Sequence, residues 1–202
     1  CWSLRRRAHG VGHRARIGHA GVGPGCPTRR RPFTMKTDAR DYWKLFKPAA
    51  CSLKLEGTTK DEVFTELIDN FVKAKCLEGS LAAQARRALV ERAGLASTGV
   101  GQRVAIPHVK LSGLEEAVFS LSIHPRGLDW SALDGDTVAI LFTVLRPERK
   151  SDRYDPERHL DMMRWISQLS RDGDFRRFAL GVTTKKGLVD LLREMSTGPD
   201  HR

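Results

Sequence analysis

The apolar residues in the first half of the chain repeat at the spacing of amphipathic helices. Between residues 60 and 75 they recur every three or four positions, behind a Gly-Thr-Thr turn that supplies an N-cap. A second such pattern covers residues 80–93, where Ser80 is placed to cap a helix and Gly94 to end it. The pattern therefore predicts two consecutive helices.

Four shorter stretches have the pattern of β-strands. Residues 51–55 and 117–123 alternate between apolar and polar side chains, which is typical of half-buried strands. Residues 103–107 contain β-branched and apolar residues and end at Pro107, a residue type confined to strand ends and edges. Residues 137–145 hold the longest apolar run of the chain, which indicates a central strand.

The last third of the chain predicts a charged loop and three further helices. Residues 146–155 are rich in charge, and Asp155 followed by Pro156 marks the start of a helix. Two closing helices are expected at residues 174–180 and 185–194.

The first 34 residues differ in composition from the rest. They carry eight arginines and no acidic residue, so they hold +8 of the net charge of +11 and leave +3 for the remainder. Such a segment cannot bury enough apolar surface to offset its ordering entropy, so we expect a disordered basic extension. A nucleic-acid-binding arm is the alternative, but a remainder at +3 has no basic footprint, and we expect no nucleic-acid partner.

The composition also sets the expected domain boundaries. Residues 1–40 form the basic extension, residues 41–196 a single domain and residues 197–202 a tail. The first methionine is Met35, and our hypothesis is that translation starts there.

No apolar run approaches the ~20 residues that a membrane helix requires, and the N-terminus has no apolar signal region. We therefore expect no membrane insertion. The four cysteines lie far apart without a C-x-x-C pair, which indicates neither a zinc knuckle nor a disulfide framework. A reducing cytoplasm is the expected location.

One histidine follows directly on a predicted strand end. The polar, glycine-containing loop 97–101 leads into the strand at 103–107, and His108 comes next. Functional groups often lie on loops held by a rigid scaffold, although a histidine after proline is also a common surface residue. His124 precedes a predicted turn at residues 125–130, and we assign it no function.

Two more residues are expected on the inner faces of helices. Arg92 continues the apolar series of the helix at 80–93, near its C-terminus. Its guanidinium either reaches solvent or the last carbonyls of the helix, or binds a phosphate. His159 lies near the start of the helix after Pro156 and is either a core histidine or a site residue kept neutral by the helix N-terminus.

Five short motifs then occur in order along the chain. They are Ala-Leu-Val-Glu-Arg at 88–92, Ser-Thr-Gly-Val-Gly at 97–101, Val-Ala-Ile-Pro-His at 104–108, Leu-Asp-Trp-Ser-Ala-Leu-Asp-Gly at 128–135 and His-Leu at 159–160. With a sixteen-residue step from Arg92 to His108, the chain from about residue 46 to residue 195 resembles the enzyme IIA domain of the bacterial phosphotransferase system, mannitol/fructose class. The nitrogen-regulatory branch is the nearest likeness.

The resemblance implies a fold and a chemistry. The fold is a three-layer α/β domain with a small mixed β-sheet flanked by helices. By the same resemblance His108 accepts a phosphoryl group, Arg92 clamps its oxygens and His159 is a second donor. The loop residues Ser97 and Thr98 would support the phosphoryl site through hydroxyls and backbone N–H groups. No metal or other cofactor is implied. The two inward histidines could instead bind zinc, but no further ligand has suitable spacing.

The implied partners follow from the resemblance as well. The phosphoryl donor would be the phosphocarrier protein HPr or its nitrogen-branch relative. Downstream lies either a regulated target protein or, in a sugar-transport role, a separate IIB component. We favour the regulatory role. A transfer-inactive binding module is a third possibility.

Two departures from the family pattern bear on these partners. Ala93 stands where the family usually has glutamate, which removes a charge from the edge of the site. Ala93 is the residue that argues for the binding module. The loop at 146–158 is longer and more charged than expected, so it could contact or exclude a partner.

Overall fold

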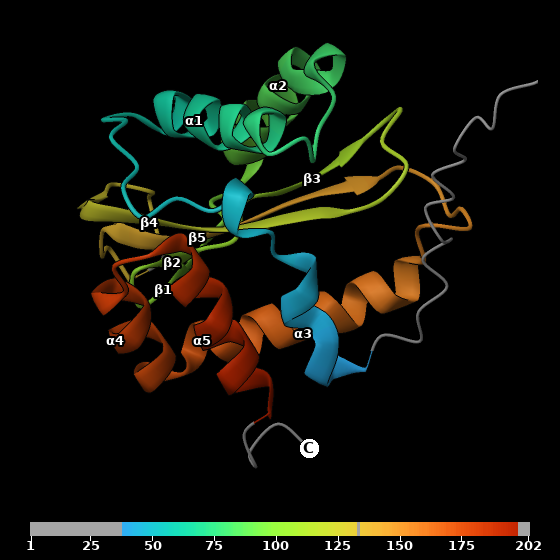
Figure 1. The fold of residues 1–202 in the computed structure, drawn as a ribbon. Helices are drawn as coiled ribbons and strands as arrows, with labels where there is room; N and C mark the ends of the chain where they lie inside the picture. Colours follow the sequence, from blue (N-terminus) through green and yellow to red (C-terminus); the bar gives the residue numbers. More distant parts are fainter. Residues whose placement is uncertain (1–37, 133, 198–202) are drawn as a thin grey trace, which may run out of the picture. The chain divides into compact units, whose positions relative to one another are not determined.

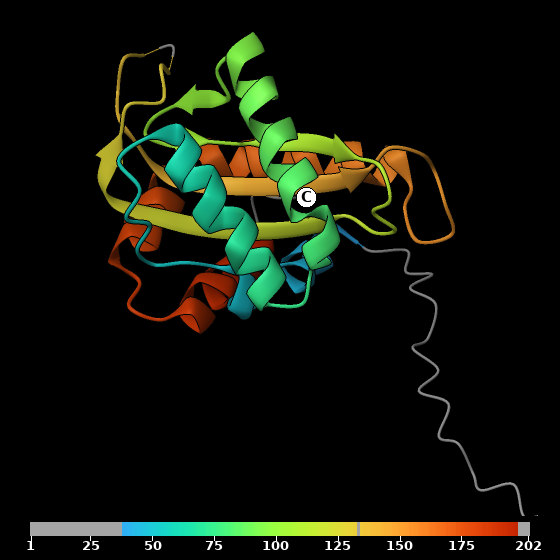
Figure 2. The same ribbon diagram turned by 90° about the horizontal axis from the view of Figure 1, so that it is seen from above.

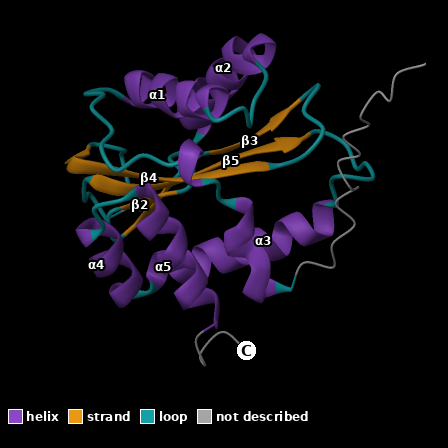
Figure 3. Ribbon diagram, viewed as in Figure 1, coloured by secondary structure: helices purple, strands orange, loops and turns teal. Residues whose placement is uncertain are grey.

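A five-stranded mixed sheet lies between two layers of helices (Figures 1 and 3). The structure, a computed structural model, describes residues 38–132 and 134–197. The predicted basic extension and the hypothesis on Met35 therefore fall outside the described residues. In chain order the described elements are η1 (Ala39–Leu45), η2 (Pro48–Ala50), α1 (Lys60–Lys73), α2 (Gly79–Leu95), β1 (Gly99–Gly101), β2 (Val104–Ala105), β3 (His108–Leu111), β4 (Val118–Leu128), β5 (Val138–Pro147), α3 (Pro156–Arg171), α4 (Gly173–Gly181) and α5 (Lys185–Thr197).

Strand β5 is the centre of the sheet, as its long apolar run predicts. It pairs in parallel with β2 at Ile140 and Leu141 and with β3 from Val144 to Pro147. It pairs antiparallel with β4, while β1 pairs with β2. Since β2 and β3 follow one another along the same side of β5, β4 must occupy its other side.

Each face of β5 contributes to a separate apolar core. Leu141 and Leu145 pack in the cluster under α1 and α2. Phe142 and Val144 point the other way, into a cluster with residues of η1, α3, α4 and α5. Successive side chains of a strand alternate between faces, so one apolar strand supplies both layers. Seen from above, α1 and α2 run across the strands (Figure 2).

The helix predictions differ in how well their ends are placed. Thr59 and Glu62 form a capping box at the start of α1. Asp155 accepts from the Glu157 N–H at the start of α3. The predicted ends of the second helix are wrong, because α2 begins at Gly79 with no side-chain cap and continues through Gly94. Gly94 is not among the residues with positive φ, so it remains helical instead of ending the helix in a left-handed turn.

Two predictions around β4 are also wrong. The segment 51–55 is not a strand; it meets β4 through the Ile123 N–H to the Ser52 carbonyl (2.8 Å) and the Leu55 N–H to the Ile123 carbonyl (2.9 Å). The predicted turn after Ile123 is part of β4, which continues to Leu128 through a register shift. His124 is consequently a buried strand residue rather than a turn residue.

Candidate functional site

His108 is the first residue of β3. The predicted strand at 103–107 is only the two residues of β2, followed by Ile106 and Pro107 and then by β3. Proline has no N–H to give to a ladder, so the line of strands is interrupted here. The Pro107 carbonyl still accepts from the Val144 N–H (2.9 Å), and this hydrogen bond holds the segment between β2 and β3 beside β5.

One ring nitrogen of His108 is fixed by the backbone. Nδ1 lies 2.8 Å from the Ile106 carbonyl oxygen. A carbonyl can only accept, so Nδ1 carries the proton, and in the neutral ring Nε2 holds the lone pair. The side chain is half-buried. The site therefore presents a single, defined nucleophilic nitrogen.

His159 lies in the first turn of α3 and is only 8% exposed. Burial first, and then the charges of Arg146 and His108, lower the pKa of His159 from 6.5 to about 4. The imidazole is therefore neutral at pH 7. The charge of His108 contributes to this lowering of the pKa, so the two side chains lie within electrostatic range of each other.

The packing around Val144 gives the same result independently. Val144 is the register partner of both His108 on β3 and Phe119 on β4. The Phe119 ring lies 6.5 Å from the His159 ring, centroid to centroid. His159 thus packs against the face of the sheet from which His108 projects.

Arg92 is not brought into contact with either imidazole. It is half-buried on α2, and its Nη1 donates to the Ala96 carbonyl at 3.0 Å, just beyond the C-terminus of its own helix. This is the first of the two arrangements expected for it, a cation on the last carbonyls. A role for Arg92 as a phosphoryl clamp remains a prediction.

The hydroxyls of Ser97 and Thr98 are both engaged with Trp130. Ser97 Oγ donates to the Trp130 carbonyl (2.9 Å) and accepts from the Gly99 N–H (3.1 Å). Thr98 Oγ1 accepts from the buried Trp130 indole N–H at 2.9 Å. These bonds tie the segment that leads into β1 to Trp130. Support of a phosphoryl group by these two residues remains a prediction.

Arg146 is a residue beside His159 that the sequence reasoning did not single out. It is half-buried near the end of β5, and its Nη1 donates to the Tyr154 hydroxyl at 3.0 Å. Tyr154 is itself 4% exposed, and its ring centroid lies 5.8 Å from that of His159. The sequence feature that could have indicated Arg146 is its position directly after the apolar run of the central strand.

His159 also lines a cavity of about 720 Å³. Its walls come from η1, the start of β4 and the charged loop before α3, and they include Tyr42, Phe119 and Tyr154 but not His108. The charged loop thus forms part of the surroundings of His159. Within residues 38–132 and 134–197 no three His, Cys, Asp or Glu side chains cluster as a metal site would need.

Comparison with known proteins identifies the class to which this fold and site belong. The family model described as "Phosphoenolpyruvate-dependent sugar phosphotransferase system, EIIA 2" matches residues 44–195. The chain therefore belongs to this family of phosphotransferase-system proteins, as its motifs predict.

Among the relatives of this chain are a nitrogen regulatory protein and a sugar-specific EIIA component. The chain is 33% identical to a nitrogen regulatory protein of Pseudomonas aeruginosa over 110 residues, 54% of this chain and 68% of that protein. It is 30% identical to the fructose-specific EIIA component of Haloferax volcanii over 144 residues, 71% of this chain and 89% of that protein.

The fold matches solved structures of the same class. The nitrogen regulatory protein IIA-Ntr from Neisseria meningitidis superposes with a TM-score of 0.65 at 23% identity, over 74% of this chain and 97% of that chain. This confirms the predicted α/β fold with a mixed sheet. No helix in the described part of the chain is long and apolar enough to cross a membrane.

Proposed function

We propose that this protein carries a phosphoryl group on Nε2 of His108. The observation that supports this most directly is the hydrogen bond from Nδ1 to the Ile106 carbonyl, which leaves the lone pair on Nε2 of a half-buried ring. A neutral imidazole nitrogen is a competent nucleophile near pH 7, and its phosphoramidate keeps a high transfer potential.

The transfer balances with no other reagent. The lone pair of His108 Nε2 attacks the phosphorus of a donor phosphohistidine, and the donor N–P bond breaks with its electron pair left on the donor nitrogen. The proton on Nδ1 stays where the Ile106 carbonyl holds it. Such a transfer depends mainly on in-line positioning and on cations around the equatorial oxygens.

Two further roles belong to the proposal. His159 is neutral, and its buried Nδ1 has no hydrogen-bond partner within the described residues, so the ring is free to serve the phosphoryl group as a donor through one nitrogen. Arg92 would clamp the phosphoryl oxygens after leaving the Ala96 carbonyl, to which it now donates.

The donor we propose is HPr or its nitrogen-branch relative, and the role we propose is regulation of a target protein. A relative named nitrogen regulatory protein supports this choice. A relative named as a fructose-specific EIIA component supports the alternative, transport through a separate IIB component. A solved structure of the E. coli mannitol IIA in complex with phosphorylated IIB has the same fold, with a TM-score of 0.57 at 14% identity.

The test is a labelling reaction. The purified protein is incubated with radiolabelled phosphoenolpyruvate and either enzyme I and HPr or their nitrogen-branch relatives, and an acid-labile adduct of one phosphoryl group per chain is expected. His108→Ala should abolish it, and Arg92→Ala should slow it about tenfold or more, the scale of a lost charge-assisted contact. A wild-type protein that stays unlabelled beside visibly phosphorylated HPr and its nitrogen-branch relative would instead support a transfer-inactive binding module.

A further inference from the structure

The register of the sheet places Arg146 beside His108. In the parallel pairing of β3 with β5, His108 lies opposite Val144 and Lys110 opposite Arg146. Residues two apart on a strand share a face, so Arg146 projects from the same face as Val144 and His108. Two residues along and one strand across separate their Cα atoms by roughly 8 Å, within the span of an arginine side chain.

The same face carries the helix that presents His159. Val144 packs with residues of α3 in one apolar cluster, and both Arg146 and His108 act on the His159 imidazole. His108, His159 and Arg146 therefore converge from three elements, β3, α3 and β5.

Arg146 itself makes no ion pair within residues 38–132 and 134–197. Among the described residues its one hydrogen bond goes to the Tyr154 hydroxyl, which uses one of five guanidinium N–H groups. Two cations of the neighbouring loop do have counter-ions, because Arg153 pairs with Glu115 and Lys150 with Asp155. A half-buried guanidinium without a counter-ion is costly to keep, which favours a site that receives an anion.

We infer that Arg146, held in place by Tyr154, binds the oxygens of the phosphoryl group on His108 from the α3 side of the sheet. This rests on the proposed function. The guanidinium matches phosphate oxygens in a planar, bidentate geometry. Tyr154 is a positioning residue, since it touches Arg146 and His159 from the charged loop. By this inference the charged loop at residues 146–158 contributes Tyr154 to the site.

Four variants test the inference in the labelling reaction. Arg146→Gln removes the charge, Arg146→Lys keeps the charge without the fork, and Tyr154→Phe removes only the anchoring hydroxyl. The matched control is Arg149→Gln, an exposed arginine three residues further along. We expect Arg146→Gln to slow labelling and shorten the lifetime of the adduct by about tenfold. Arg146→Lys should restore part of the loss, Tyr154→Phe should lose about threefold, and Arg149→Gln should match the wild type.

A second measurement does not depend on phosphoryl transfer. The wild type and Arg146→Gln are titrated with inorganic phosphate while the imidazole nitrogens of His108 and His159 are followed by NMR. We expect phosphate to shift both rings in the wild type, and the apparent affinity to fall at least about fivefold in Arg146→Gln. If the wild type is never labelled but this difference is seen, the proposed function fails while the anion site stands.

The results that overturn the inference are equally defined. Wild-type labelling rate, adduct lifetime and phosphate response in a folded Arg146→Gln would remove Arg146 from the site. An absence of any phosphate response in the wild type would do the same. If Arg146→Gln does not fold, as judged by its NMR spectrum, Arg146→Lys and Tyr154→Phe decide, and wild-type behaviour in both would overturn the inference.

Discussion

Two strands that pair with β5, β3 and β4, each carry a histidine, and the surroundings of the two histidines differ. His108 on β3 has Nδ1 at 2.8 Å from the Ile106 carbonyl, and His124 on β4 has Nε2 at 2.9 Å from the Gly57 carbonyl. Both rings are thus oriented by one backbone oxygen. His108 is half-buried, however, whereas His124 is 2% exposed and its other nitrogen is buried without a partner in the described residues.

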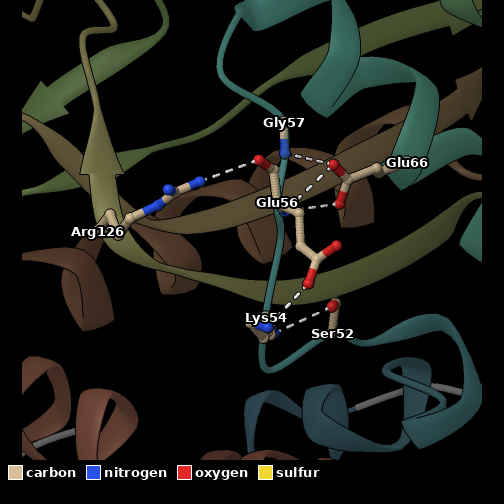
Figure 4. Close-up of polar contacts among 6 residues, drawn as sticks. All are labelled: Ser52, Lys54, Glu56, Gly57, Glu66 and Arg126. Carbon is tan, nitrogen blue, oxygen red and sulfur yellow. Dashed lines mark hydrogen bonds and ion pairs between the residues drawn. The ribbon is translucent and has the colours of Figure 1, made fainter.

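The difference lies in what covers each strand. The segment 52–57 runs along β4 and is held there by side chains from other elements (Figure 4). The Glu66 carboxylate of α1 accepts from the backbone N–H groups of Glu56 and Gly57, and Arg126 donates to the Glu56 carbonyl. Strand β3 pairs with β5, and no isolated bridge of this kind to β3 occurs among the described residues.

Exchanging each histidine for glutamine is the strongest test of this comparison. His108→Gln should lower phosphoryl labelling more than about a thousandfold, because it removes the nucleophile. His124→Gln should label at the wild-type rate but lose about 1–3 kcal/mol of unfolding free energy, because it disturbs a buried hydrogen bond. Labelling rates and urea unfolding of both variants decide the question. Retained labelling in His108→Gln, or lost labelling in a folded His124→Gln, would break the comparison.

His159 extends the comparison to a third histidine. It is buried like His124, but it lies on the face of the sheet from which His108 projects. Its folded pKa of about 4 is below the 6.5 expected in the unfolded chain, so between these values the unfolded state binds more protons. The contribution of the neutral His159 ring to the free energy of unfolding is therefore complete above pH 6.5. It falls by at most roughly 3 kcal/mol as the pH drops toward 4.

Urea unfolding from pH 4 to pH 7 measures this effect as the difference between wild type and His159→Gln. The carboxylates titrate in both proteins and cancel in the difference. We expect the unfolding free energy of His159→Gln to increase relative to that of the wild type as the pH falls. A constant difference over this range would contradict the low pKa of His159.

Substitution of Glu66 tests how the segment 52–57 is held along β4. Glu66→Gln keeps the size of the side chain but weakens its bonds to the Glu56 and Gly57 N–H groups, so we expect a loss of about 1–2 kcal/mol in unfolding free energy. Hydrogen exchange at these two amides should rise in parallel. The control is Glu91→Gln, an exposed glutamate on α2. Equal stability of the two variants would show that the carboxylate does not hold the segment.

Lys54 should have the smallest effect of the set. Its ammonium pairs with Glu56 at 2.8 Å, but both side chains are largely exposed, at 72% and 68%. Surface pairs of this kind contribute little because water screens them. Thermal unfolding of Lys54→Ala should match that of the wild type. A clear drop in the midpoint would mean that the pair, and not Glu66 alone, fastens the segment.

Much of the architecture could be predicted from local patterns. The cap of α1 at Thr59, the start of α3 at Asp155 and Pro156, and the central place of β5 all depend on neighbouring residues or on uninterrupted apolar character. The inward position of His159 follows from helical spacing in the same way. Such features need no knowledge of what packs against them.

The sequence by itself therefore determined most of the helices, the central strand, the family and the candidate nucleophile at His108. Only the tertiary structure decided that Arg146 and Tyr154 join His159, that Arg92 turns to Ala96, and that His124 is covered. Periodicity records which face of an element is apolar. It does not record which distant segment lies across that face, and the charge and exposure of a site depend on that neighbour.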